Sequence, residues 1–125
     1  MNKEGLGESA EDYLEAMLML KEKNGYIRSI DIADLLGVTK PSVSNAVKRL
    51  REKGYIEMDN SSFITLTKTG DEVAKSVYER HKTITDFFVS LGVDRAVAAA
   101  DACRIEHILS EETYSALMKL KDKMN

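Results

Sequence analysis

Three residues near the carboxyl end of the chain have the spacing of a metal site. Cys103, Glu106 and His107 stand at positions i, i+3 and i+4, so a thiol, a carboxylate and an imidazole share one face of a helix that we expect over residues 94–109. All three groups are ligands for divalent transition metals. The pattern therefore predicts a metal-ligand arrangement on this helix.

Three further side chains can complete such a shell. Asp12 and Glu15 lie three residues apart on a first helix expected over residues 9–23, and His81 lies at the edge of the apolar stripe of a long helix expected over residues 67–91. Each residue also has an ordinary role, as a solvated acid, a packed histidine or a buried free cysteine. Spacing alone therefore leaves a metal site and ordinary packing as alternatives, although burying several acids without a cation costs on the order of several kcal/mol.

Catalysis by a thiol is a poor explanation of the same residues. Cys103 and His107 point side by side on one helix, with no evident oxyanion donors or pocket. The sequence contains no glycine-rich phosphate loop and no zinc-protease motif. We therefore predict that the protein is not an enzyme and has no small-molecule substrate.

The stretch from Ser29 to Gly54 predicts a helix-turn-helix. Ser29 can cap a short helix that Gly37 ends, and Thr39 can cap a second helix with Pro41 in its first turn. The buried stripe of the second helix consists of Val43, Ala46, Val47 and Leu50. In such a motif the second helix enters the major groove of DNA.

The opposite face of this second helix carries phosphate binders and base-edge donors or acceptors. The predicted DNA-binding residues are Thr39, Lys40, Pro41, Ser42, Ser44, Asn45, Lys48 and Arg49. Residues 54–58 and 63–67 alternate as two strands around a run of turn formers, so a β-hairpin wing follows the helix. This order predicts a winged helix-turn-helix, with a winged helix used only for protein contacts as an alternative.

The composition is that of a mostly helical globular protein. The 125 residues are 43% hydrophobic and 31% charged, with one proline and a net charge of −3. Residues 39–53 nevertheless carry five bases against one acid, so an acidic total does not exclude DNA. A single cysteine and the lack of a secretory or membrane-spanning segment predict a cytoplasmic protein with no membrane partner.

The predicted fold class is mostly α, with two domains. Residues 1–72 form the winged helix-turn-helix with its small hairpin, and residues 73–125 form a helical domain for metal binding and dimerisation. A winged helix needs only about the first 70 residues of the chain. The apolar stripes of the remaining helices favour burial against a second copy, since helix-turn-helix proteins usually read DNA as two-fold dimers.

From residue 9 to residue 120 the chain resembles the metal-dependent repressors that include the diphtheria toxin repressor and the manganese transport regulator. The resemblance rests on EDYLEAMLML, SIDIADLLGVTKPSVSNAVKRLREKGYI, LTKTG, ERH and ACRIEHILS. It implies a homodimer that binds operator DNA when loaded with Mn²⁺ or Fe²⁺, with Zn²⁺ possible in vitro, and that controls genes of metal-ion uptake. The positions that match the family's metal ligands are Asp12, Glu15, His81, Cys103, Glu106 and His107.

Two positions within this resemblance point to different metals. Asp12 resembles the manganese-type members, whereas Cys103 resembles the iron-type members, which have a thiol where manganese sensors have a carboxylate. Thr85 and Ala99 match positions of an ancillary site in iron-type members and cannot bind a metal, so we expect no second site of that form. The alternative function is a winged-helix regulator that responds to an organic ligand or a thiol oxidant through Cys103.

Overall fold

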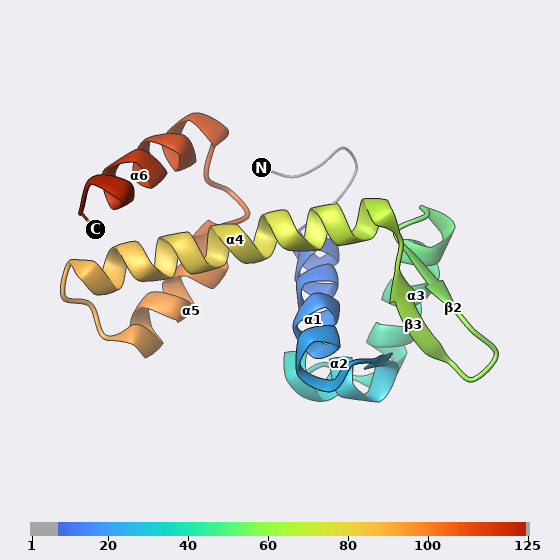
Figure 1. Ribbon diagram of the computed structural model, residues 1–125. Helices are drawn as coiled ribbons and strands as arrows, with labels where there is room; N and C mark the ends of the chain where they lie inside the picture. Colours follow the sequence, from blue (N-terminus) through green and yellow to red (C-terminus); the bar gives the residue numbers. More distant parts are fainter. Residues whose placement is uncertain (1–7, 125) are drawn as a thin grey trace. The chain divides into compact units, whose positions relative to one another are not determined.

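The computed structural model describes residues 8–124. The elements are α1 (Glu8–Asn24), β1 (Ile27–Arg28), α2 (Ser29–Leu36), α3 (Lys40–Glu52), β2 (Ile56–Met58), β3 (Phe63–Leu66), α4 (Lys68–Ser90), α5 (Arg95–Ile105) and α6 (Glu111–Met124) (Figure 1). Two compact units divide between Lys75 and Ser76, inside α4. We call them the N-terminal unit and the C-terminal unit and describe each by itself. Among the described helices, none combines the length and the apolar character needed to cross a bilayer.

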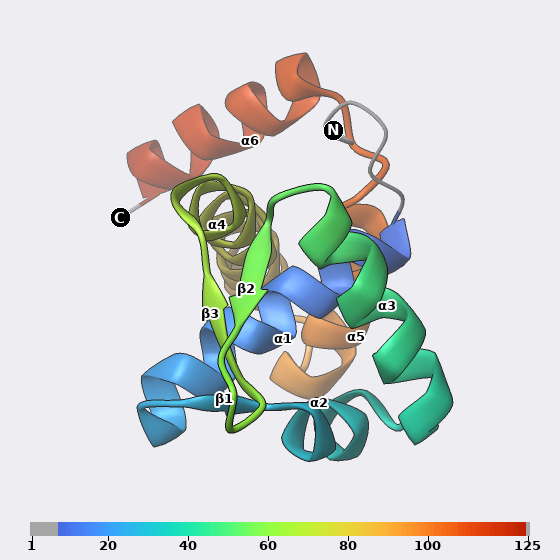
Figure 2. The same cartoon turned by 90° about the vertical axis from the view of Figure 1, so that its right-hand side faces the viewer.

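The N-terminal unit packs three helices against a small antiparallel sheet. The strand order is β1-β3-β2, with Ile27 opposite Ile64 and Ile56 opposite Leu66. Figure 2 shows the hairpin of β2 and β3 beside α3. The buried side chains of this unit include Ile27, Ile32, Val43, Val47, Ile56 and Ile64. The fold is therefore the predicted mostly helical winged helix-turn-helix, with one strand more than the sequence indicated.

The turn between α2 and α3 follows from local sequence. Gly37 has a left-handed φ of 67° and ends α2, and its N–H donates to the carbonyl of Ala33. Thr39 caps α3, since its hydroxyl oxygen accepts from the Ser42 N–H at 3.2 Å. Pro41 sits in the first turn, where no hydrogen bond is lost. These three predictions are confirmed, as is the buried stripe of α3.

Other predicted helix boundaries are wrong. Ser29 is already inside α2, whose N-cap is Arg28 with extended φ and ψ and no side-chain cap. Ser9 likewise lies inside α1, which begins at Glu8, one residue before the predicted start of this helix. Leu91, the last residue of the helix predicted over residues 67–91, is 60% exposed because α4 ends at Ser90 and the chain reverses at Gly92.

The first turn of α4 is held against the end of the helix-turn-helix. The Thr67 N–H donates to the Tyr55 carbonyl at 3.1 Å, and the Thr67 hydroxyl donates to the Gly54 carbonyl at 2.7 Å. The same hydroxyl oxygen accepts from the Gly70 N–H and so caps α4. A Cβ at Gly70 would overlap the Tyr55 carbonyl, so this close approach of two backbones requires glycine.

The C-terminal unit is built around the second part of α4. In both views α5 and α6 lie on opposite sides of this helix (Figures 1 and 2). The Tyr114 hydroxyl of α6 donates to Thr83 Oγ1 at 3.3 Å. Asp86 forms ion pairs with Arg95 on one side and Lys121 on the other, at 3.3 and 3.8 Å. Helices α5 and α6 are therefore both anchored to α4 by polar contacts.

Candidate metal centre and DNA-binding surface

The predicted DNA-binding residues form one exposed surface on α3 and its N-cap. All eight, from Thr39 to Arg49, are exposed, while Val43 and Val47 between them are buried. The helix therefore turns one face to the core and leaves its cationic and amide side chains available to a duplex.

Asp31 on the neighbouring helix α2 forms an ion pair with Arg28. Arg28 Nε lies 3.0 Å from Asp31 Oδ2, and this hydrogen bond together with the charge of Asp31 raises the pKa of the Arg28 guanidinium above its ordinary value. Asp31 therefore carries its counter-charge within the N-terminal unit.

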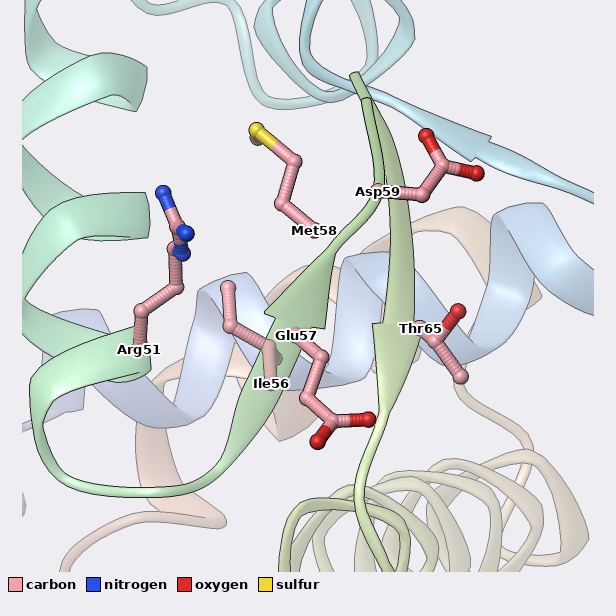
Figure 3. Close-up of a pocket in the computed structure, with 6 residues that line it drawn as sticks. All are labelled: Arg51, Ile56, Glu57, Met58, Asp59 and Thr65. Carbon is pink, nitrogen blue, oxygen red and sulfur yellow. The ribbon is translucent and has the colours of Figure 1, made fainter. Parts of the chain in front are cut away.

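Arg51 of α3 is not among the residues predicted to bind DNA. Arg51 lines a groove between α3 and β2 together with Ile56, Glu57, Met58, Asp59 and Thr65 (Figure 3). It also lines a shallow depression with Lys48 and Glu52. Arg51 stands three residues after Lys48, and this spacing could have indicated from the sequence that both side chains lie on the same face of α3. Arg51 extends the cationic surface of α3 toward the wing.

The C-terminal unit brings together two of the predicted metal ligands. His81 Nδ1 on α4 and Glu106 Oε1 lie 2.9 Å apart, and the Glu106 side chain is fully buried. His107, the next residue, is 2% exposed. An imidazole and a carboxylate in hydrogen-bond contact, with a second imidazole one residue away, offer nitrogen and oxygen donors that suit a divalent transition metal.

The helix that carries these residues is shorter than expected. α5 ends at Ile105, so Glu106 is its C-cap and His107 lies in the following turn, not on the helix face with Cys103. The chain tightens into a turn there, because the Ile108 N–H donates to the Ile105 carbonyl three residues back. Arg80 of α4 holds this turn, since it donates to the Leu109 carbonyl at 3.1 Å and more weakly to the Glu106 carbonyl at 3.5 Å. Backbone bonds to the third residue back and side-chain donors both commonly satisfy the carbonyls at a helix end.

The remaining candidates lie on α1 and on α5. Asp12 and Glu15 are three residues apart on α1, as predicted, with Asp12 half-buried and Glu15 8% exposed. Cys103 is exposed on α5, although Glu106 and His107 after it are buried. The thiol is therefore more accessible to solvent than the two ligand candidates that follow it in the chain.

Two family models cover nearly the whole chain. Residues 5–62 match the iron dependent repressor N-terminal DNA binding domain, and residues 67–125 match the iron dependent repressor metal binding and dimerisation domain. The chain belongs to the iron-dependent repressor family. Members of this family are transcriptional regulators rather than enzymes, and this repressor is accordingly a metal-dependent regulator with a DNA-binding and a dimerisation domain.

Individual relatives agree with this assignment. The repressor is 40% identical over 125 residues to an uncharacterized HTH-type transcriptional regulator of Methanocaldococcus jannaschii, covering 95% of this chain and all of that one. It is 37% identical over 116 residues to the transcriptional regulator MntR of Escherichia coli, covering 93% of this chain and 75% of that protein. The solved structure of the manganese regulator SloR superposes with a TM-score of 0.80 at 30% identity, covering 90% of this chain. This chain spans 53% of the SloR chain, about half its length.

Proposed function

We propose that this repressor binds operator DNA as a homodimer when loaded with Mn²⁺ or Fe²⁺, and that it controls genes of metal-ion uptake in the cytoplasm. The observation that carries the proposal is the 2.9 Å contact of His81 with the buried Glu106, inside the domain matched as metal-binding. A buried carboxylate in contact with a partly exposed imidazole offers oxygen and nitrogen donors to a divalent transition metal.

Six residues are the proposed ligands of this metal, namely Asp12, Glu15, His81, Cys103, Glu106 and His107. The metal supplies positive charge that offsets the carboxylates, and the imidazole nitrogens bind it in their neutral form. Because Asp12 and Glu15 come from the N-terminal unit, a shared metal would connect the DNA-binding half to the dimerisation half of each subunit.

This connection is the proposed switch. A ligand shifts a conformational equilibrium only by its preference for one state, so the metal acts by selecting the arrangement that binds DNA. In that arrangement the two α3 helices of a dimer would stand about one DNA turn, roughly 34 Å, apart. Each α3 would then present its exposed face to one half-site.

The proposal is tested first on the candidate ligands Glu106 and His107. We expect Glu106→Ala and His107→Ala to abolish metal-stimulated binding to an operator selected from random duplexes, while the dimer remains folded. Glu112→Ala is the matched control, since Glu112 is an exposed acid in the first turn of α6. Equal DNA affinity with and without metal in the wild type would contradict the switch.

The identity of the metal is tested separately. An anaerobic titration of Mn²⁺, Fe²⁺ and Zn²⁺ against operator binding ranks the ions, because a thiol favours Fe²⁺ or Zn²⁺ and carboxylates suit Mn²⁺. Cys103→Ser tests the part played by the thiol. If Cys103 is a ligand, we expect this variant to lose more response to Fe²⁺ than to Mn²⁺.

The same variant addresses the alternative function of Cys103 as an oxidant sensor. That alternative draws on the exposure of the thiol. It requires operator binding by the wild type to respond to peroxide in the absence of metal and requires Cys103→Ser to lose that response. A metal response without a peroxide response favours the metal-dependent repressor.

A further inference from the structure

Arg80 is a charged residue in the interior of the C-terminal unit. Its side chain is 1% exposed, and it falls on the same stripe of α4 as the buried Val77 and Ile84. A guanidinium stays ionised at all ordinary pH values, and an unpaired buried charge is costly. Its partners therefore have to be supplied by the elements packed around it.

The partners that the structure shows lie between Glu106, at the end of α5, and Tyr114, in the first turn of α6. Besides the carbonyls of Glu106 and Leu109, Arg80 Nη2 lies 2.6 Å from Glu111 Oε1, and the guanidinium stands 4.4 Å from the centre of the Tyr114 ring. Arg80 thus contacts the end of α5, the connecting turn and the first turn of α6. One guanidinium can do this because it is planar and holds five N–H donors in a rigid arrangement that suits several acceptors at once.

The segment that Arg80 holds carries two of the proposed ligands. Glu106 and His107 are the first two residues of the segment that Arg80 contacts, and a further proposed ligand, His81, directly follows Arg80 on α4. We infer that Arg80 is a positioning residue for the metal centre, which sets where Glu106 and His107 stand and makes that position depend on the docking of α6. This inference rests on the proposed metal-binding function.

The coupling has a direct physical basis. Residues that hold ligands in place without touching the metal commonly change its affinity by about 10- to 100-fold when replaced. The Glu111 carboxylate is the anionic partner of Arg80 that the structure places on α6, and its side chain is 75% exposed, so a glutamine of the same shape can replace it without leaving a cavity in the core. Removing its charge should leave Arg80 less firmly oriented and the turn less well held.

The test compares two neighbouring acids of α6 in the full-length protein. Glu111→Gln and Glu112→Gln remove the same charge from the same exposed helix turn, but the carboxylate in contact with Arg80, at 2.6 Å, is that of Glu111. We expect Glu111→Gln to weaken Mn²⁺ binding, measured by chelator competition without DNA, by about tenfold, and Glu112→Gln to leave it unchanged. The visible absorption of bound Co²⁺ should also change in Glu111→Gln alone, because this spectrum reports ligand geometry rather than stability.

A second pair of variants keeps the inference testable if Glu111→Gln perturbs folding. Tyr114→Phe removes the hydrogen bond to Thr83 but keeps the ring beside Arg80, whereas Tyr114→Leu removes both. We expect the loss of Mn²⁺ affinity in Tyr114→Leu to exceed that in Tyr114→Phe. Equal affinities and unchanged Co²⁺ spectra across both pairs would overturn the positioning role. Failure of the wild type to bind either ion would instead overturn the proposed metal site itself.

Discussion

At the scale of single residues, the exposed side chains of α3 are the proposed contacts to a DNA backbone. Lys48 is exposed and borders the depression that Arg51 also lines. If Lys48 contacts a phosphate, Lys48→Ala should weaken operator binding and reduce the slope of log affinity against log salt by about one unit. Lys119→Ala on α6 removes the same charge elsewhere and should leave the slope unaltered. An unchanged slope in Lys48→Ala would place this lysine away from the phosphates.

The residues also differ in how far their roles could be inferred from sequence. Thr39 and Gly37 act on their own neighbours in the chain, so local patterns predicted both correctly. Arg80 contacts residues from Glu106 to Tyr114, at least 26 positions away, and no local pattern specifies such partners. Its one signal was a charge at a position of α4 that the stripe of Val77 and Ile84 marks as buried. The ligand roles of the six metal candidates stay predictions.

Among the elements, the start of α4 depends on a single glycine. Because a Cβ at Gly70 would overlap the Tyr55 carbonyl, Gly70→Ala must displace either the first turn of α4 or the strand entry at Tyr55. We expect the free energy of unfolding in urea to fall by about 1–3 kcal/mol, the usual cost of overpacking. Thr69→Ala, one residue earlier and exposed, should change it by less than about 0.5 kcal/mol. A Gly70→Ala variant as stable as the wild type would contradict the close approach.

Element boundaries were harder to infer than the elements themselves. The second helix and the hairpin wing have clear 3.6- and 2-residue periods, and both are present. β1 has two residues and no periodicity to detect, so its pairing with β3 was missed. The end of α5 was misplaced for a different reason, because Arg80, which holds the turn after this helix, lies on α4 rather than in the adjacent sequence.

At the level of the whole molecule, the sequence predicted the mostly helical fold and its order of domains. The predicted division after residue 72 stays a prediction; the compact units of the structure divide after Lys75, within α4. One continuous helix therefore belongs to both units. The connection that matters for regulation is proposed to be the metal, since it draws ligands from α1 as well as from the C-terminal unit. That connection should be measurable as stability.

A metal that binds only the folded protein must raise its free energy of unfolding. At a free Mn²⁺ concentration 100 times the dissociation constant the gain is about 2.7 kcal/mol, seen as a higher urea midpoint than in EDTA. Protein concentration must be held constant, because dimerisation also contributes to stability. Glu106→Ala should lose most of this gain, since it removes a buried proposed ligand, whereas Glu112→Ala should keep it. If the wild type unfolds at the same urea concentration in EDTA and in Mn²⁺, the metal does not bind preferentially to the folded state, and it cannot hold the two units in the arrangement that reads DNA.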